Sequence, residues 1–377
     1  MENYKAINSD GIPHDEHPRG AGPSSQKVAI LRNHTQPSYK QPGPNFIFEV
    51  KTRDVPSFKD DEVLVKILVS GVCGTDLAIA KGYLGESKEI LGHEGIGYII
   101  GCGQKVKSPY AKLSQYVGVG WLRDACGSCT PCTRDTTRCE IKVYSGVNVD
   151  GTLASYAVVP DRYITPVPDD VAPELLAPIM CAGVTAYKAL KVAKVTPGSW
   201  VLISGAGGGV GMLAIAYAKA MGYRVVAVDM GSRKAGACLA GGAEAYVDCG
   251  DVKDVREEVA RATQGRLCAA AIVCAGVAVA YEQAIECLDY FGTLVAVGIM
   301  PRTAKLGINP LKFIDFGIRF VGSITGDRID VAEAVEFVRR GLVVPKVTVI
   351  GFDELGDYVK RMDEMEGKLV VRTGADE

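Results

Sequence analysis

The feature that most constrains the fold is a regular alternation of apolar strands and helices over residues 184–324. The apolar runs are predicted as strands at Val201–Ser204, Tyr223–Asp229, Ala269–Cys274, Gly292–Val297 and Arg319–Gly322. Helical stretches separate them, including one predicted over Met212–Met221. Alternation at this spacing is typical of an α/β domain with a parallel, doubly wound sheet.

The preceding residues, 26–183, follow a different pattern, in which short β-type runs are broken by Gly and Pro. Runs such as Val63–Val69, Gly97–Gly101 and Ala154–Val159 predict an irregular, mostly antiparallel domain. After residue 324 the sequence predicts a helix near Val331–Arg340, a strand near Lys346–Ile350 and a helix near Asp353–Met365. At 377 residues the chain is long enough for two domains, each with its own core.

The charge balance argues against two classes of partner. The chain carries 42 Lys and Arg against 44 Asp and Glu, so no net field attracts nucleic acid or an anionic membrane. No apolar run reaches the roughly 18 residues that span a bilayer. Residues 1–25 are polar and rich in Gly, Pro and Ser, which predicts a disordered tail rather than a signal peptide or a mitochondrial presequence. We therefore expect a cytoplasmic protein whose twelve cysteines are metal ligands and buried thiols rather than disulfides.

Four of these cysteines fall within fourteen residues, at Cys126, Cys129, Cys132 and Cys139. Thiols on such tight spacing do not readily pair with one another, but they can surround one tetrahedral Zn²⁺. Four thiolates would close the coordination sphere, so this ion could stabilise a lobe but could not bind a substrate. The alternative is a group of unmetallated thiols.

A glycine-rich turn joins the predicted strand Val201–Ser204 to the helix that follows it. It reads Gly205-Ala-Gly-Gly-Gly-Val-Gly211, with Ala206 in the first position of the G-x-G-x-x-G pattern. Gly208 would let the backbone approach a pyrophosphate, Gly211 would let the helix pack close to the strand, and the helix N-terminus offers N–H groups to phosphates. The motif is weak by itself, but its place between a strand and a helix predicts a dinucleotide site. The alternative is a turn that binds nothing.

Asp229 ends the next predicted strand, 18 residues after Gly211. Its carboxylate can accept hydrogen bonds from both adenosine ribose hydroxyls and would repel a 2′-phosphate, which favours NAD(H) over NADP(H). Lys234 is placed to bind the same ribose. The turn residues that we predict to contact NAD(H) with them are Gly205, Gly207, Gly208, Gly209, Val210 and Gly211.

Cys73, His93 and Cys181 form a second candidate metal site. Each is uninformative alone, because buried free cysteines are common core residues; His93 is the only histidine after position 34. Together the three could supply a Cys₂His zinc site whose fourth position stays open to water or substrate. Glu94 cannot remain an isolated buried charge, so we interpret it as a group that supports the site or occasionally replaces a ligand.

Together these motifs resemble those of the zinc-dependent medium-chain alcohol dehydrogenases, particularly the tetrameric microbial branch. The resemblance covers about Gln26 to Arg372 and includes the strings Cys181–Leu190 and Ser204–Asp229. It implies a GroES-like catalytic domain at 26–183, to which 325–377 returns, and a Rossmann domain at 184–324. It also implies two Zn²⁺ per chain, NAD(H), a small alcohol or carbonyl substrate, and a homo-oligomer formed through the edge strand near Ile318–Gly322.

The resemblance also implies a role for each candidate residue. The ligands of the catalytic zinc would be Cys73, His93 and Cys181, and those of the structural zinc Cys126, Cys129, Cys132 and Cys139. The hydroxyl of Thr75 would lie beside the substrate oxygen, and Thr185 would contact nicotinamide. Leu84 and Trp121 would line the substrate pocket. Gly298 and Arg372 would contact the cofactor, with Arg372 on its pyrophosphate.

The chain departs from the family pattern at three places. Gly74 follows the first zinc cysteine where many members carry His or Arg, and this removes a pyrophosphate contact. Ala78 occupies the position of the histidine that ends the usual proton relay. Finally, six residues separate Cys132 from Cys139, rather than the usual seven, which puts that zinc loop under strain.

These departures leave more than one function open. The leading interpretation is a zinc- and NAD(H)-dependent oxidoreductase acting on an alcohol/carbonyl pair. The alternative is a NAD(P)H-dependent reductase of a conjugated C=C or an iminium bond in a biosynthetic intermediate, because such chemistry has less need of a relay at Ala78. A non-catalytic, NAD-binding zinc protein is a third hypothesis, against which the retained Thr75 and Glu94 argue.

Overall fold

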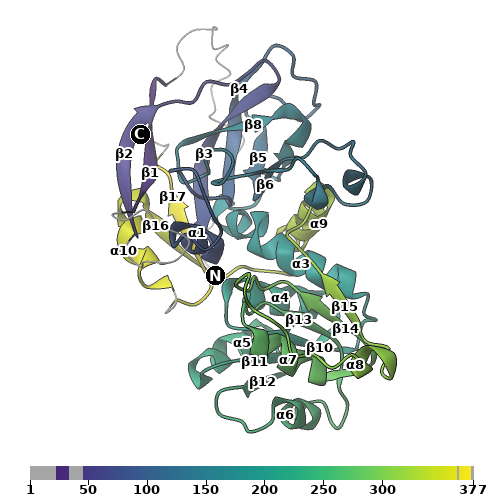
Figure 1. Cartoon of the computed structure of the whole chain (residues 1–377). Helices are drawn as coiled ribbons and strands as arrows, with labels where there is room; N and C mark the ends of the chain where they lie inside the picture. Colours follow the sequence, from purple (N-terminus) through teal and green to yellow (C-terminus); the bar gives the residue numbers. More distant parts are fainter. Residues whose placement is uncertain (1–22, 34–45, 363–364, 375–377) are drawn as a thin grey trace.

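The computed structural model describes residues 23–33, 46–362 and 365–374, which form two sheet-based domains with helices α3 (Ala182–Ala193) and α9 (Arg328–Arg339) between them (Figure 1). The tail expected at 1–25 lies almost entirely outside the described residues, and Ser25 already belongs to a strand. Within the described residues, no single helix is long and apolar enough to cross a membrane, although the bent pair Pro173–Met180 and Ala182–Ala193 together has the length and composition.

The first domain contains a seven-stranded sheet in the order β16-β17-β3-β4-β5-β9, with β8 paired to β3. Its strands are β3 (Glu62–Val72), β4 (Gly95–Cys102), β5 (Tyr116–Val119), β8 (Tyr156–Pro160), β9 (Thr165–Pro166), β16 (Val347–Gly351) and β17 (Lys368–Arg372). All neighbours are antiparallel except β16 and β17. Strands from the C-terminal part of the chain thus complete this sheet, and β17 pairs with β3 so that Leu369 lies opposite Val72.

Smaller elements complete this domain. They are the hairpin β1 (Ser25–Asn33) with β2 (Phe46–Asp54), the pair β6 (Leu122–Asp124) with β7 (Val143–Tyr144), and the helices α1 (Gly74–Ala80), α2 (Pro173–Leu176) and α10 (Leu355–Val359). The helix predicted near Asp353–Met365 is wrong in extent: among the described residues of this range, the α-helix α10 covers Leu355–Val359, after a 3₁₀ turn at Phe352–Glu354. Gly356 lies within α10 and lowers the helix propensity of this segment.

The second domain is a six-stranded, all-parallel sheet in the order β12-β11-β10-β13-β14-β15. Its strands are β10 (Trp200–Ser204), β11 (Arg224–Asp229), β12 (Ala245–Asp248), β13 (Cys268–Val273), β14 (Leu288–Ala296) and β15 (Arg319–Gly322). Its helices are α4 (Gly209–Ala220), α5 (Ala235–Gly241), α6 (Val255–Ala262), α7 (Ala278–Glu286) and α8 (Leu311–Ile314). The strand order reverses between β10 and β13, and a crevice at the carboxyl ends of such strands is where dinucleotides bind in this fold.

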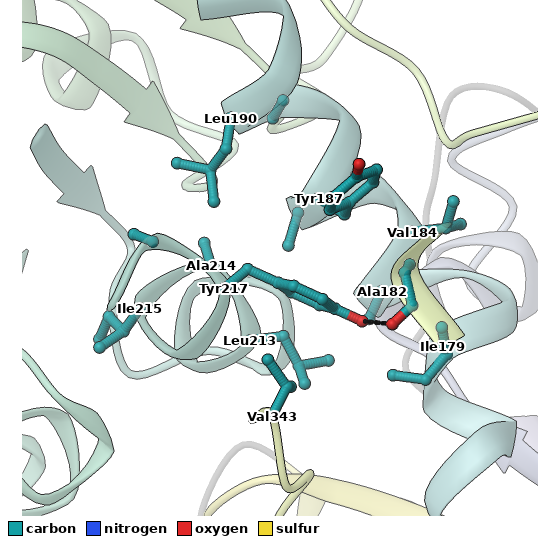
Figure 2. Close-up of a cluster of buried hydrophobic side chains, with 14 of the residues drawn as sticks. Ile179, Ala182, Val184, Tyr187, Leu190, Leu213, Ala214, Ile215, Tyr217 and Val343 are labelled. Atoms are coloured by element: carbon teal, nitrogen blue, oxygen red, sulfur yellow. Dashed lines mark hydrogen bonds between the residues drawn. The ribbon is translucent and has the colours of Figure 1, made fainter. Parts of the chain in front are cut away.

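The junction between the domains is an apolar core in which α3 packs against α4 and α9 (Figure 2). Tyr187 and Leu190 of α3 face Tyr217 and Leu213 of α4 in this core. Tyr217 is fully buried, and its hydroxyl donates to the Ala334 carbonyl at 3.0 Å. The position of α3 is therefore fixed by close packing, and α3 begins directly after Cys181.

Candidate active site and metal centres

Three distant segments bring the predicted catalytic ligands together. Cys73 follows β3 and caps α1, His93 precedes β4, and Cys181 caps α3. The ligand atoms of Cys73, His93, Glu94 and Cys181 all lie within 4.8 Å of one another. Four potential ligands from separate parts of the chain thus converge in a buried space of the size that one ion requires.

His93 is oriented by Asp76, a residue that our sequence analysis missed. The Asp76 Oδ1 atom lies 3.0 Å from His93 Nδ1, while Oδ2 accepts a hydrogen bond from the Cys73 backbone N–H at 2.9 Å. Within the described part of the chain, His93 Nε2 is buried and has no hydrogen-bond partner. An imidazole held at one nitrogen by a carboxylate and unpartnered at the other is the usual arrangement of a metal ligand, so Asp76 positions two ligands at once.

The protonation of these groups also fits a metal site. A hydrogen bond from Cys181 lowers the pKa of the Cys73 thiol well below its ordinary value, despite burial, and the Lys368 charge adds to the effect. Burial disfavours a charged imidazole, but the Asp76 carboxylate and Cys73 together outweigh it and raise the pKa of His93 well above its ordinary value. Protons therefore compete for His93, and we expect metal affinity to fall as the pH falls. Thiolate and imidazole together suit Zn²⁺.

Glu94 is not an isolated charge, because Lys368 Nζ donates to its Oε1 at 2.7 Å and both side chains are buried. Burial raises the pKa of Glu94 to about 7, against the opposing charge of Lys368. The stem of Lys368 also reaches the glycine-rich turn, since its Cδ lies 2.9 Å from where a Cβ on Gly209 would be. Lys368 therefore connects the catalytic cluster to the predicted cofactor loop, a contact that sequence reasoning missed.

Arg372, predicted at the pyrophosphate, lies elsewhere. It donates to Glu174 at 3.0 and 3.2 Å, its side chain is 67 % exposed, and it lines an open cavity of about 370 Å³ with Lys27 and Asp353. Leu369 of the same strand pairs with Val72, the residue before Cys73, whereas Arg372 pairs with Val69. This register places Lys368, the first residue of β17, near the site and Arg372, the last, away from it. Lys368 is thus the cation of β17 that lies against the glycine-rich turn.

The four-thiol lobe is assembled as the spacing predicts. The sulfur atoms of Cys126, Cys129, Cys132 and Cys139 all lie within 4.8 Å of one another. The Cys126 N–H donates to Cys139 Sγ at 3.3 Å, and the Cys129 N–H donates to Cys126 Sγ at 3.4 Å. Backbone N–H groups of Ser128 and Cys129 lower the pKa of Cys126 to about 6. The six-residue interval before Cys139 therefore does not prevent the four thiols from meeting.

The glycine-rich turn lies at the carboxyl end of β10, and α4 begins at Gly209, three residues earlier than predicted. A Cβ at Gly211 would overlap the Gly205 carbonyl, which explains the glycine there. Asp229 Oδ2 accepts from the Gly207 N–H at 2.8 Å, and its Oδ1 pairs with Lys234 Nζ at 2.7 Å. Asp229 thus contacts both Lys234 and the glycine-rich turn.

The remaining candidates surround this arrangement. Thr75 Oγ1 lies 3.6 Å from Cys73 Sγ, and Thr185 is buried in the first turn of α3. Val210 is half-buried in the first turn of α4, and a Cβ at Gly298, just beyond β14, would overlap the Ala275 carbonyl.

Two aromatic side chains, Trp121 and Tyr144, pack one after the other next to His93. The Trp121 ring lies edge-on to His93, with centroids 4.9 Å apart, and it stacks on Tyr144 at 4.7 Å. Leu84 packs against the same apolar cluster as Trp121. Tyr144 was not predicted, because it comes from β7, beyond the four-thiol lobe, and no local pattern links it to Trp121.

Comparison with known proteins agrees with this geometry. Residues 59–169 match the alcohol dehydrogenase GroES-like domain, and residues 209–340 match the zinc-binding dehydrogenase domain. The chain is 39 % identical over 357 residues to an alcohol dehydrogenase of Schizosaccharomyces pombe, covering 93 % of this chain and 98 % of that protein. An alcohol dehydrogenase of Geobacillus stearothermophilus is 38 % identical over 336 residues, covering 87 % and 96 %.

Solved structures lead to the same family. The alcohol dehydrogenase of the archaeon Aeropyrum pernix superposes with a TM-score of 0.78 at 27 % identity, covering 92 % of this chain and 99 % of that one. Its fold is the combination of a GroES-like domain and a Rossmann-type parallel sheet that is described above. The chain is therefore an oxidoreductase of the zinc-dependent medium-chain dehydrogenase/reductase family, to which the alcohol dehydrogenases belong.

Proposed function

We propose that the protein binds two Zn²⁺ per chain and transfers a hydride between NAD(H) and an alcohol or its aldehyde or ketone. The observation that carries the proposal is the convergence of Cys73 and Cys181 on His93, whose buried Nε2 atom has no hydrogen-bond partner among the described residues. When bound, the ion would polarise the substrate oxygen, and NAD(H) would accept or supply the hydride. The four-thiol lobe would hold the second, structural ion.

The chain's own residues would orient the reactants and move the proton. Asp76 fixes the imidazole of His93, and Thr75, next to Cys73, is placed to exchange a proton with the substrate oxygen. Thr185, one turn after Cys181, would orient the nicotinamide. Trp121 and Leu84 would shape the pocket and exclude water from it. Beside the glycine-rich turn, we assign to Lys368 the phosphate contact that the sequence had suggested for Arg372.

Asp229 supports NAD(H) as the cofactor. Asp229→Ser is expected to lower kcat/KM for NADH by about 10- to 100-fold, since hydrogen bonds to charged groups contribute about 1.5–3 kcal/mol, while kcat/KM for NADPH should rise. Steady-state kinetics with both cofactors measures the change. Glu244→Ser is a matched control, because Glu244 is exposed and pairs with Arg224 at the opposite end of β11. An unchanged NADH/NADPH preference in Asp229→Ser would show that Asp229 does not select the cofactor.

Ala78 supports the second candidate, reduction of a conjugated C=C or C=N bond. It lies on α1 one turn after Thr75, and its methyl group cannot pass a proton onward. Stopped-flow measurement of NADH oxidation with simple aldehydes and with conjugated enals separates the two candidates. We expect simple aldehydes to react in single turnovers. If hydride is transferred to the enals but not to the simple aldehydes, the proposed alcohol/carbonyl activity is wrong and the second candidate is favoured.

Two further proposals concern the protein as a whole. We place it in the cytoplasm, as the composition suggests, and we propose a homo-oligomer formed through β15. This strand ends the six-stranded sheet, so one of its sides has no partner strand within the described chain, and Phe320 on it is 41 % exposed. An edge of this kind is suited to pairing with a second copy.

A further inference from the structure

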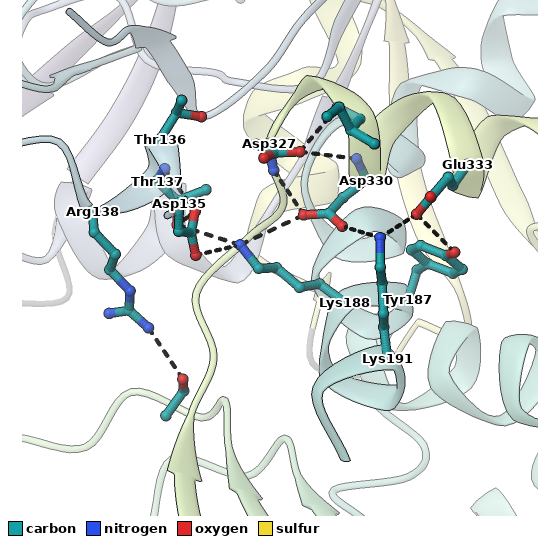
Figure 3. A network of polar contacts seen from close by, with 12 residues as sticks. Asp135, Thr136, Thr137, Arg138, Tyr187, Lys188, Lys191, Asp327, Asp330 and Glu333 are labelled. Atoms are coloured by element: carbon teal, nitrogen blue, oxygen red, sulfur yellow. Dashed lines mark hydrogen bonds and ion pairs between the residues drawn. The ribbon is translucent and has the colours of Figure 1, made fainter. Parts of the chain in front are cut away.

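A buried network of charged side chains connects the four-thiol lobe to helices α3 and α9 (Figure 3). At its centre, Lys188 of α3 donates to Asp135 Oδ2 at 2.7 Å and lies 3.5 Å from Asp330 Oδ2 of α9. The Lys188 side chain is only 10 % exposed. A cation this deeply buried depends on its counter-charges, because an unpaired charge is costly to keep out of water.

Asp135 belongs to the metal lobe, inside the interval between Cys132 and Cys139. While Oδ2 binds Lys188, Oδ1 accepts from the Thr137 N–H at 2.9 Å and from the Thr137 hydroxyl at 2.6 Å. These bonds cap the single turn that leads directly into Cys139. The Asp135 side chain therefore does two things: it holds the backbone turn before Cys139, and it supplies a counter-charge to Lys188.

Lys188 in turn belongs to the helix that presents the catalytic thiol. Cys181 caps α3, the Thr185 N–H donates to the Cys181 carbonyl at 2.9 Å, and Lys188 follows three residues later. Spacings of four and three place these residues on successive turns along one side of the helix. A shift or rotation of α3 at Lys188 would therefore move Cys181 as well.

We propose that Lys188 is a positioning residue that ties the four-thiol lobe to α3, so that the metal-bound lobe holds Cys181 in place at the catalytic centre. The inference rests on the proposed function, because it concerns the catalytic metal ligand. The exposed Arg138 also extends from the lobe, but among the described residues its hydrogen bond goes to the Gly322 carbonyl of β15, at 3.1 Å, and not to α3. Lys188 is the cation of the network that joins the lobe to α3.

The test compares Lys188→Met with Lys191→Met in enzyme that carries Zn²⁺ in the lobe and Co²⁺ in the catalytic site. Lys191 lies one turn further along α3 and pairs with Asp330 and Glu333, but it does not reach the lobe (Figure 3). The visible absorption of cobalt reports the geometry of its thiolate and imidazole ligands. We expect Lys188→Met to shift these bands and to lower kcat about tenfold, equivalent to roughly 1.4 kcal/mol, with the KM for NADH nearly unchanged. Lys191→Met should match the wild type.

Asp135→Asn is a second variant that keeps the test valid if Lys188→Met does not fold. The asparagine oxygen can still cap the turn at Thr137, but the lobe's own charge facing Lys188 is lost, while Asp330 of α9 remains. We expect it to shift the cobalt bands in the same direction as Lys188→Met. Wild-type bands and kcat in folded Asp135→Asn would overturn the positioning role. A wild-type protein that takes up metal only in the lobe would overturn the proposed function itself, so the two failures are distinguishable.

Discussion

Cys73→Ser is expected to abolish metal binding at the catalytic site while the four-thiol lobe keeps its zinc. The metal content should fall from two ions per chain to one, and kcat/KM should fall about 10³-fold, the effect of losing roughly 4 kcal/mol of transition-state stabilisation. The physical reason is that Cys73 is one of three non-carboxylate ligands that converge there within the described part of the chain, and its lowered pKa makes it the readily available thiolate. Elemental analysis of the purified protein and steady-state kinetics measure the two quantities.

Cys102→Ser provides the matched control for this experiment. Cys102 is also a free cysteine of the first domain, but it is exposed at the end of β4, its Sγ donates to the Ala111 carbonyl at 3.6 Å, and it belongs to neither thiol cluster. Metal content and kinetics of this variant should equal those of the wild type. If Cys73→Ser kept two ions and full activity, the converging ligands would have no catalytic role, and the non-catalytic scaffold would be the better interpretation.

The parts of the fold that the sequence predicts are those with a strong local pattern. The parallel sheet is predicted because its strands are buried on both faces, so that Trp200–Ile203 of β10 forms an uninterrupted apolar run. By contrast, β17 was not predicted, and its antiparallel partner β3 lies about 300 residues away in the sequence. No local periodicity encodes such a pairing.

The same distinction holds for the site. The four-thiol group could be proposed from residue type and spacing, whereas Cys73, His93 and Cys181 are widely separated in the sequence and were proposed from residue type together with the family resemblance. Asp76 and Lys368 could not be proposed, because their roles depend on contacts with His93 and Glu94 that only the folded chain creates. The choice between Lys368 and Arg372 shows this most clearly: both are cations of one strand, and only its register against β3 decides which one faces the site.

Ala78→His is expected to raise the rate of alcohol oxidation by about 10²-fold, because a positioned general base typically contributes about 10²–10⁴-fold. Residues 75 and 78 are three apart on α1, so a histidine at 78 would lie on the same side of the helix as Thr75 and could take the proton onward. Only neutral imidazole accepts a proton. The rate in the variant should therefore be low below the histidine pKa, near 6.5 when unperturbed, and rise as the pH passes through it.

The pH profile separates a relay from a mere change of shape at this position. Ala78→Gln has a side chain of comparable size that cannot titrate, so it should gain neither the rate nor the rising limb near pH 6.5. Enal reduction should change little in either variant, since the proton that it needs does not arrive at the substrate oxygen. Equal alcohol-oxidation rates for the histidine and glutamine variants would mean that proton removal does not limit the rate of alcohol oxidation by this enzyme. Ala78 would then give no support to the second candidate function.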